Sequence, residues 1–245
     1  MYALVKGAKT NIYIGKNAGK RVRNHLKKAS SSIGIISPYL SSELIADIRE
    51  MQDSRVNVHL VTTSEILNAP KSGNIIRELV RQFRTVRHKS LKTRKIALLV
   101  RWPIYLAILA SFYFTYKGNI SIWQSGIFSV VALIILNRLL NIRVYDYYYE
   151  TALKVTCLLS PGTVGYGNGV SLCHTKLYLI DGKTAFLGSL NYTWSGVKYN
   201  TESCIEVLDR ESVQDLKKYF FEVFNSEQKM DLAKLGPRYF REPKN

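Results

Sequence analysis

The sequence of 245 residues contains only three cysteines, Cys157, Cys173 and Cys204, and their spacing fits no metal-ligand pattern. Their number is odd, so we expect a domain with reduced thiols that faces the cytosol. A secretory signal is also missing, because the short N-terminal segment is interrupted by Lys6 and Gly7. These absences favour an intracellular chain without structural disulfides.

Acidic residues are scarce as well. Eighteen Asp and Glu stand against 35 Lys and Arg, which gives a formal net charge of +17. A charge of this size favours polyanionic partners, either nucleic acid or an anionic membrane surface, but it is no indication of catalysis. The length predicts one domain with a proper buried core.

A stretch near the C-terminus carries closely spaced polar residues around a predicted hairpin. Leu177–Ile180 and Thr184–Leu187 are apolar and β-prone, and Asp181-Gly182 between them is a strong hairpin signal. His174 and Lys176 stand two positions apart, so on one strand they project from the same face. We therefore expect both residues to lie on the first strand of the hairpin.

The returning strand would bring Ser189 and Asn191, again two apart, close to that face. An imidazole, an ammonium, a hydroxyl and an amide would then converge on one pocket. This set suits an oxyanion with a phosphorus or carbonyl centre, in which Lys176 and Asn191 hold the charge while His174 attacks or transfers a proton. A His-x-Lys pair alone is common by chance, whereas the longer pattern is specific.

The complete pattern is His-x-Lys, four residues, Asp181, six residues, Gly188-Ser189-x-Asn191, and then Glu202. It resembles the signature of the phospholipase D superfamily, and every position is filled. Ile35–Leu40 resembles the second strand in the first half of such domains. The resemblance implies an α/β fold with a phospholipase D-like mixed sheet flanked by helices.

The resemblance also implies a ping-pong phosphodiesterase in which His174 attacks phosphorus and forms a phosphohistidine. Lys176 and Asn191 would neutralise and position the non-bridging oxygens, and Ser189 would donate a hydrogen bond. Glu202 would accept a hydrogen bond from the other ring nitrogen of the histidine and fix its tautomer.

Two motif residues are expected to be structural. Asp181 lies at the turn beyond the strand, so we expect it to accept hydrogen bonds there, and Gly188 belongs to the same structural part of the motif. No cluster of His, Asp and Glu suggests a metal, and the resemblance implies that neither a metal nor another cofactor is needed.

The chain contains one copy of the signature. His25, His59 and His88 each lack a lysine two positions further on, so the first half supplies no second His-x-Lys. The resemblance to single-motif members therefore implies a two-fold homodimer that completes the active site. In it, His174 of the partner subunit would protonate the leaving oxygen and then activate water.

The middle of the chain carries long apolar runs. The stretch from Ile96 to Leu140 contains two arms, each close to the ~20 residues that a bilayer-spanning helix needs, with a tight connection at Lys117–Asn119. Aromatic residues stand where interfacial anchors are expected, and Arg101 can extend toward the headgroups. The sequence predicts a transmembrane helical hairpin; the alternative is a buried helical hairpin in a soluble domain.

Flanking charges predict the orientation of this hairpin. Nine basic residues and one acid lie between Lys71 and Lys95, and Arg138 and Arg143 follow the second arm, whereas the tip carries only Lys117. By the positive-inside rule, both halves of the catalytic domain lie in the cytoplasm. We thus expect three parts: residues 1–95, the hairpin 96–140, and residues 141–245 with the motif.

The basic run itself shows helical periodicity. Apolar residues recur at helical spacing from Ile76 to Val86, which predicts an amphipathic helix that enters the membrane. The basic side chains on its polar side are candidates for binding the membrane surface or, less favoured, a nucleic-acid backbone: Arg77, Arg81, Arg84, Lys92 and Lys95.

The remaining segments alternate between strand and helix patterns. This alternation predicts an α/β layer with parallel strand pairing. Pro161–Gly169 is rich in glycine but lacks a phosphate-loop ending, so we interpret it as a turn at the mouth of the site. The tail Lys234–Asn245 contains two prolines and is expected to be irregular. Strands are expected at 11–14, 33–36, 56–61, 154–159 and 204–208, and helices at 18–29, 42–52 and 211–224.

The sequence leaves alternatives open for the substrate. Small single-motif members resemble endonucleases, and the net charge fits DNA or RNA. The membrane hairpin favours a phospholipid, which a phospholipase D-type hydrolase or transphosphatidylase would use. An inactive membrane scaffold is a third possibility, disfavoured because every motif position is intact.

Overall fold

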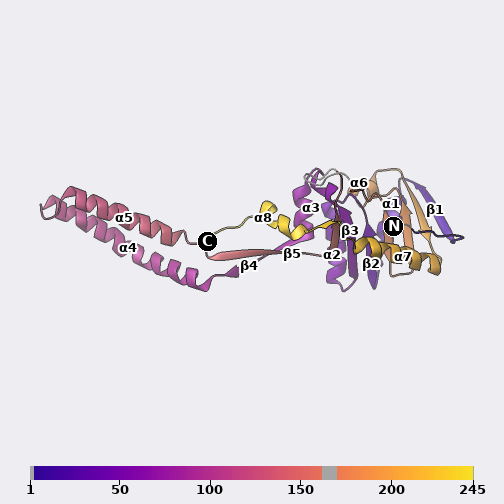
Figure 1. Cartoon of the computed structure of the whole chain (residues 1–245), viewed down its shortest axis with the longest axis horizontal. Coiled ribbons are helices and arrows are strands. Elements are labelled where there is room, and N and C mark those ends of the chain that lie inside the picture. Colours follow the sequence, from indigo (N-terminus) through magenta and orange to yellow (C-terminus); the bar gives the residue numbers. More distant parts are fainter. Residues whose placement is uncertain (1–2, 162–169, 245) are drawn as a thin grey trace. The chain divides into compact units, whose positions relative to one another are not determined.

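The computed structural model describes residues 3–161 and 170–244, so the body of the predicted glycine-rich turn, residues 162–169, lies outside the described residues. The chain forms two compact units. Unit 1 comprises Met1–Arg81 and Tyr149–Phe240, and unit 2 comprises Gln82–Tyr148 and Arg241–Asn245. Figure 1 labels the helices of both units and the strands β1 to β5.

Unit 1 is built on a mixed sheet. Among the described residues, an eight-stranded sheet has the order β1-β9-β8-β7-β2-β3-β6-β10. Its strands are β1 (Thr10–Gly15), β2 (Ser32–Ile36), β3 (Asn57–Thr63), β6 (Lys154–Leu158), β7 (Leu177–Ile180), β8 (Thr184–Gly188), β9 (Glu202–Val207) and β10 (Lys229–Met230). The pairs β2–β3 and β3–β6 are parallel, as the strand-helix alternation predicts, and the signature hairpin β7–β8 adds antiparallel pairs.

Helices cover both faces of this sheet. They are α1 (Ala18–Lys27), α2 (Ser42–Asp53), α3 (Ser72–Leu79), α6 (Trp194–Lys198), α7 (Arg210–Phe224) and α8 (Gly236–Tyr239), with 3-10 turns η1 (Ser64–Leu67) and η2 (Leu232–Leu235). One apolar core lies under α1, α2 and α3, and a second lies under α7. Figure 1 shows α7 running along one side of the sheet. The α/β fold with a mixed sheet flanked by helices is thereby confirmed.

Unit 2 consists of a helical hairpin and part of a two-stranded ribbon. The hairpin is α4 (His88–Tyr116) and α5 (Ile122–Leu140), and the ribbon pairs β4 (Val80–Val86) with β5 (Tyr145–Thr151). Both helices are long and apolar enough to cross a membrane. Only 6% of the most apolar 18-residue window of α4 and 17% of that of α5 is buried. The alternative of a buried hairpin in a soluble core is therefore disfavoured.

Small hydroxyl residues hold the two helices of the hairpin together. Ser125 of α5 donates to the carbonyl oxygen of Ser111 at 3.1 Å and also contacts the hydroxyl of Thr115. At the other end, the guanidinium of Arg94 donates to the carbonyl oxygen of Leu140 at 3.2 Å. Small and hydroxyl-bearing side chains let helices approach closely in an apolar environment, as membrane helix pairs do.

The predicted amphipathic helix over the basic run is wrong. The segment begins as helix α3, which ends at Leu79. It continues as strand β4 from Val80 to Val86, and helix α4 then begins at His88. Its β-branched and aromatic residues pair with the tyrosine-rich β5, and the ring of Phe83 stacks on Tyr148 with centroids 5.1 Å apart. Tertiary pairing therefore overrides the helical periodicity of the apolar residues.

Two smaller expectations also differ from the structure. The strand that starts the signature hairpin begins at Leu177, so His174 and Lys176 precede it. The tail is not wholly irregular, because η2 and α8 occupy Leu232–Tyr239. Gly236 packs so closely on Tyr149 that an added Cβ would lie 2.1 Å from the ring, and this contact fixes the turn.

Candidate active site

The sheet topology gathers the signature residues at one edge. Because β7 is antiparallel to β2, and β8 is antiparallel to β7 and β9, the start of β7, the end of β8 and the start of β9 meet there. Lys176 directly precedes β7, Ser189 follows β8, and Glu202 opens β9. Lys176, Ser189 and Glu202, each thirteen positions from the next in the sequence, are thus brought to the same edge by the pairings β7–β8 and β8–β9.

Lys176 and His174 form the cationic part of this site. The ammonium of Lys176 is buried, lies 2.9 Å from both ring nitrogens of His174, and donates to its carbonyl oxygen at 2.8 Å. An ammonium can only donate, so a hydrogen bond to the ring needs an unprotonated nitrogen, which is the nucleophilic form of imidazole. The imidazole itself belongs to an exposed residue and is open to a substrate.

Burial and charge act in opposite directions on Lys176. Burial lowers the pKa of its ammonium, and the nearby carboxylate of Glu202 raises it again in part. Glu202 is itself only 7% exposed. A buried cation is tolerated when a carboxylate compensates it, so Glu202 favours the charged form of Lys176 against the effect of burial.

The carboxylate of Glu202 is engaged by two neighbours. One oxygen accepts from the hydroxyl of Ser189, and the other accepts from the side-chain amide of Asn200 at 3.0 Å. Within the described residues, no hydrogen bond joins Glu202 to His174. The tautomer-fixing bond from Glu202 to His174 therefore stays a prediction, and in the described residues the hydroxyl of Ser189 donates to Glu202.

Asn191 lies on the loop after β8 and keeps one polar atom unused. Its Oδ1 is buried and has no hydrogen-bond partner among the described residues. The loop is fixed from below, since the buried hydroxyl of Tyr178 donates to the carbonyl oxygen of Leu190 at 2.8 Å. The backbone N–H of Tyr192 donates to Ser37 at 2.8 Å, which ties the loop to the end of β2. The backbone on both sides of Asn191 is thus fixed, and its Oδ1 can accept a further hydrogen bond.

Asp181 and Gly188 support the site without facing a substrate. The carboxylate of Asp181 accepts hydrogen bonds from the backbone N–H groups of Ser30, Ser31 and Ser32 at 2.8–3.1 Å. Burial acts to raise the pKa of this carboxyl, but those hydrogen bonds hold it well below its ordinary value. An added Cβ at Gly188 would lie 2.0 Å from the carbonyl oxygen of Ser203, so only glycine lets β8 approach β9 there.

Asn200 is the residue that the sequence analysis missed. It stands two positions before Glu202, so its side chain can reach the same side of the chain. An amide two residues from a motif carboxylate is a weak signal, because nothing in the sequence tells which way the turn after α6 runs.

The predicted basic surface residues are not brought together on one helix. Arg77 lies on α3 and donates to the carbonyl oxygen of Tyr239 at 3.1 Å, and Arg81 lies 3.6 Å from the carboxylate of Asp53. The others are divided between β4, which carries Arg84, and the start of α4, which carries Lys92 and Lys95.

A pocket of about 310 Å³ lies next to His174. It is lined by His174 together with Cys173, Thr175, Tyr219 and Val223, among others. In the described part of the chain, no group of three His, Cys, Asp or Glu side chains is arranged to hold a metal ion.

Three solved structures resemble this chain distantly. NucT from Helicobacter pylori has 14% identity and a TM-score of 0.48, covering 91% of this chain and 98% of NucT. Nuc from Salmonella typhimurium, a phospholipase D family member, has 12% identity and a TM-score of 0.48 with the same coverages. Phosphatidylserine synthase from Haemophilus influenzae has 10% identity and a TM-score of 0.43, covering 91% of this chain and 39% of the synthase. No curated protein sequence matches the chain.

The sequence match is more specific than these structural similarities. The family described as cardiolipin synthase, PLD-like domain, matches residues 129–224, from within α5 to the end of α7. This range contains the whole signature from His174 to Glu202. The intact signature, its convergence at one edge of a mixed sheet and the family match over residues 129–224 all support membership of the chain in the phospholipase D superfamily.

Proposed function

We propose that the chain is a membrane-anchored phosphodiesterase with His174 as its nucleophile. The observation that carries the proposal is the arrangement at the sheet edge. There the exposed imidazole of His174 lies against the buried ammonium of Lys176, and the carboxylate of Glu202 compensates the charge of that ammonium. A preorganised cation in a partly desolvated place stabilises charge that develops on phosphoryl oxygens.

The reaction would proceed in two displacements. A ring nitrogen of His174 forms a bond to phosphorus while the bond to the leaving oxygen breaks, and a general acid protonates that oxygen. Water then attacks the phosphohistidine, loses its proton to the same acid-base group, and restores the free imidazole. Lys176 and the amide of Asn191 would contact the non-bridging oxygens, and Glu202 would hold Lys176 and Ser189 in place.

The general acid would come from a second copy of the chain. One signature supplies one imidazole, whereas the nucleophile and the acid must stand on opposite sides of phosphorus. We infer a two-fold homodimer in which His174 of the partner subunit faces the first imidazole across one cleft.

A nucleic acid is the first candidate substrate. Unit 1 alone carries 23 Lys and Arg against 16 Asp and Glu, a net charge of +7. Two exposed aromatic side chains flank this region: Tyr199 stands beside Asn200, and Tyr39 precedes Leu40, which forms a β-bridge with Tyr192. Aromatic side chains next to a cationic site suit the stacking of unpaired bases, so an endonuclease acting on single-stranded DNA or RNA fits these features.

A phospholipid is the second candidate, for two other reasons. The description of the matching family names cardiolipin synthase, and unit 2 contains two helices that are long and apolar enough to cross a bilayer. A phospholipase D-type hydrolase or transphosphatidylase would need its active site near such a membrane.

The hairpin would place both its ends in the cytoplasm. Its basic residues lie at the end where α4 begins and α5 ends, whereas the connection between the helices carries only Lys117. Under the positive-inside rule this arrangement predicts a two-span anchor with the catalytic unit on the cytoplasmic side.

One set of assays tests these proposals together. The full-length protein, purified in detergent with EDTA, is offered single-stranded DNA, RNA, phosphatidylcholine and cardiolipin in parallel, with His174→Ala as the control. We expect cleavage of one class, with a labelled phosphoryl group trapped on wild-type protein by acid-free quenching and none on the variant. Cleavage without any trapped label, and equal in the variant, would contradict the proposed nucleophile.

A further inference from the structure

The positive charge of the chain is concentrated in the smaller unit. Unit 2 contains twelve Lys and Arg and two Asp and Glu, a net charge of +10, although it has far fewer residues than unit 1. More than half of the net charge therefore belongs to the part of the chain that carries the apolar hairpin.

The two acidic residues of unit 2 are already paired. Asp146 lies 2.6 Å from Arg87, and Glu242 lies 2.9 Å from Arg143. At the end of unit 2 away from the hairpin tip, six exposed basic residues form no salt bridge within the described residues. They are Arg84, Lys89, Lys92, Lys95, Arg138 and Arg241, and we call them the basal cluster.

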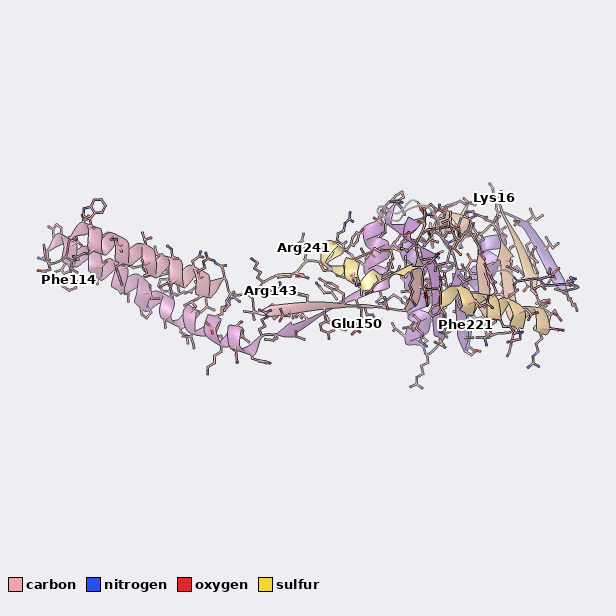
Figure 2. The ribbon with its side chains drawn as sticks, viewed as in Figure 1. Lys16, Phe114, Arg143, Glu150, Phe221 and Arg241 are labelled. Carbon is pink, nitrogen blue, oxygen red and sulfur yellow. The ribbon has the colours of Figure 1, made fainter. Side chains whose placement is uncertain are left out.

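The members of the basal cluster come from segments that meet at one end of the hairpin. The bond from Arg94 to the carbonyl oxygen of Leu140 joins the start of α4 to the end of α5. The tail is tied to the ribbon, since Gln82 donates to the carbonyl oxygen of Arg241 at 2.9 Å and Val144 donates to that of Lys244 at 2.8 Å. Figure 2 labels Arg143 at this end of unit 2 and Phe114 near the opposite end.

An apolar surface continues directly from this cluster. Ile96 and Leu99 follow Lys95 in α4 and are 50% and 76% exposed, and Leu133 and Ile134 precede Arg138 in α5. A nucleic-acid backbone would contact the cations but would leave the leucine and isoleucine side chains beside them exposed to water. A bilayer accepts both, with hydrocarbon against the apolar side chains and phosphate groups against the ammonium and guanidinium groups.

We propose that the basal cluster is a binding surface for the headgroups of anionic phospholipids, which it selects over zwitterionic ones. The inference rests on the proposed membrane anchoring and adds to it the class of lipid that surrounds the hairpin. It does not depend on whether the catalytic substrate is a lipid or a nucleic acid.

The three tryptophans allow a direct test in the full-length chain. Trp102 lies in α4 about 10 Å along the helix from Lys95 at 1.5 Å per residue, and Trp123 opens α5 at the other end of the hairpin. Two variants each keep either Trp102 or Trp123, with the other two tryptophans changed to Phe. They are placed in phosphatidylcholine vesicles that contain brominated phosphatidylglycerol or brominated phosphatidylcholine. Bromine quenches the fluorescence of a tryptophan that its acyl chain contacts.

At low salt we expect the brominated anionic lipid to be preferred at Trp102 on the order of fivefold, and the preference to shrink as salt rises. Trp123 should show almost no preference. The triple variant Lys89→Gln, Lys92→Gln, Lys95→Gln should lose most of the preference at Trp102. A matched triple variant in unit 1, at the exposed Lys183, Lys217 and Lys229, removes the same charge and should change nothing.

The outcomes separate this inference from the proposed function. Equal quenching by both lipids at Trp102 would overturn the headgroup surface while leaving the anchor intact. Absence of quenching at both tryptophans would overturn the anchor itself. A triple variant that keeps its lipid preference but loses affinity for a single-stranded oligonucleotide would show that the cluster serves nucleic acid instead.

Discussion

Unit 1 and unit 2 belong to one chain but place their apolar and charged side chains in opposite ways. In unit 1 the large aliphatic residues are enclosed between the sheet and its helices, and the buried carboxylate of Glu206 is matched by Asn11, Tyr13 and Arg21. In unit 2 the aliphatic residues of α4 and α5 face outward, and basic residues outnumber acidic ones twelve to two. Water is the natural surrounding for unit 1, and a bilayer suits unit 2.

This difference changes what the net charge means. A total of +17 suggests a nucleic-acid enzyme when it is treated as one quantity. Once the charge is divided between the units, most of it accompanies the hairpin, and the remaining +7 on unit 1 is the part relevant to a substrate. The predictions below test whether chemistry belongs to unit 1 and attachment to unit 2.

The largest effect is expected at the nucleophile. His174→Ala should lower turnover of any substrate by about 1,000-fold or more, because no other group in the site can form the covalent intermediate. The exposed Lys117→Ala at the hairpin tip is the matched control in unit 2 and should leave turnover unchanged. Steady-state rates on a small phosphodiester measure both. A folded His174→Ala variant with substantial turnover would refute the assignment.

A glycine in each unit gives the next comparison. Gly188→Ala pushes a methyl group to 2.0 Å from the carbonyl oxygen of Ser203, so β8 and β9 must separate beside Ser189 and Glu202. We expect a loss of roughly 2–3 kcal/mol of stability and of most activity. Gly126→Ala in α5 meets no atom within 4 Å and should be tolerated. Thermal unfolding and turnover, measured in detergent, distinguish the two; equal effects would contradict the close strand approach.

Asn200 tests how far the site extends beyond the signature. Asn200→Ala removes the donor to Glu202, and we expect roughly a tenfold fall in kcat with little change in KM, since the residue positions Glu202 without touching substrate. Asn200→Asp sets a second carboxylate against Glu202 and should cost more and shift the acid limb of the pH profile upward. If both variants match wild type across the whole pH range, Asn200 has no positioning role.

Asp181 should influence stability and not the chemical step. Its carboxyl pKa is depressed, so the stabilisation is present above the ordinary value of 3.8 and is lost as pH falls through the lower folded value. Asp181→Asn tolerates the positive φ of 53° but accepts fewer hydrogen bonds. We expect the variant to be about 2 kcal/mol less stable at neutral pH and its stability to decline less steeply below pH 4. Denaturant unfolding at a series of pH values measures both effects. An unchanged acid decline would contradict this role.

Much of the fold and the site could be predicted from local patterns. The hairpin from Leu177 to Gly188 follows from its β-prone runs and from Asp181-Gly182, which both adopt positive φ in the structure. The order of the sheet could not be predicted, because nothing local tells that β1 pairs with β9 from the other end of the chain. The hydrogen bond of Asn200 was missed for the same reason.

The error over the basic run has a different cause. From Ile76 to Val86 the spacing of apolar residues fits a helix, and the competing strand partner lies about sixty residues later in β5. A single segment cannot reveal that its neighbour will be a strand of tyrosines. The apolar residues therefore do recur at helical spacing, but the segment forms a strand from Val80 to Val86 because β5 pairs with it.

The separation of the two units is tested most directly by removing the hairpin. Replacing Ile96–Leu140 with a short Gly/Ser linker should move the protein from the membrane fraction to the supernatant, while turnover of bis(4-nitrophenyl) phosphate stays within about threefold of the full-length protein, because every site residue lies in unit 1. Retention of the shortened chain in the membrane fraction, or a soluble folded chain without turnover of this small diester, would contradict the division of labour between the units.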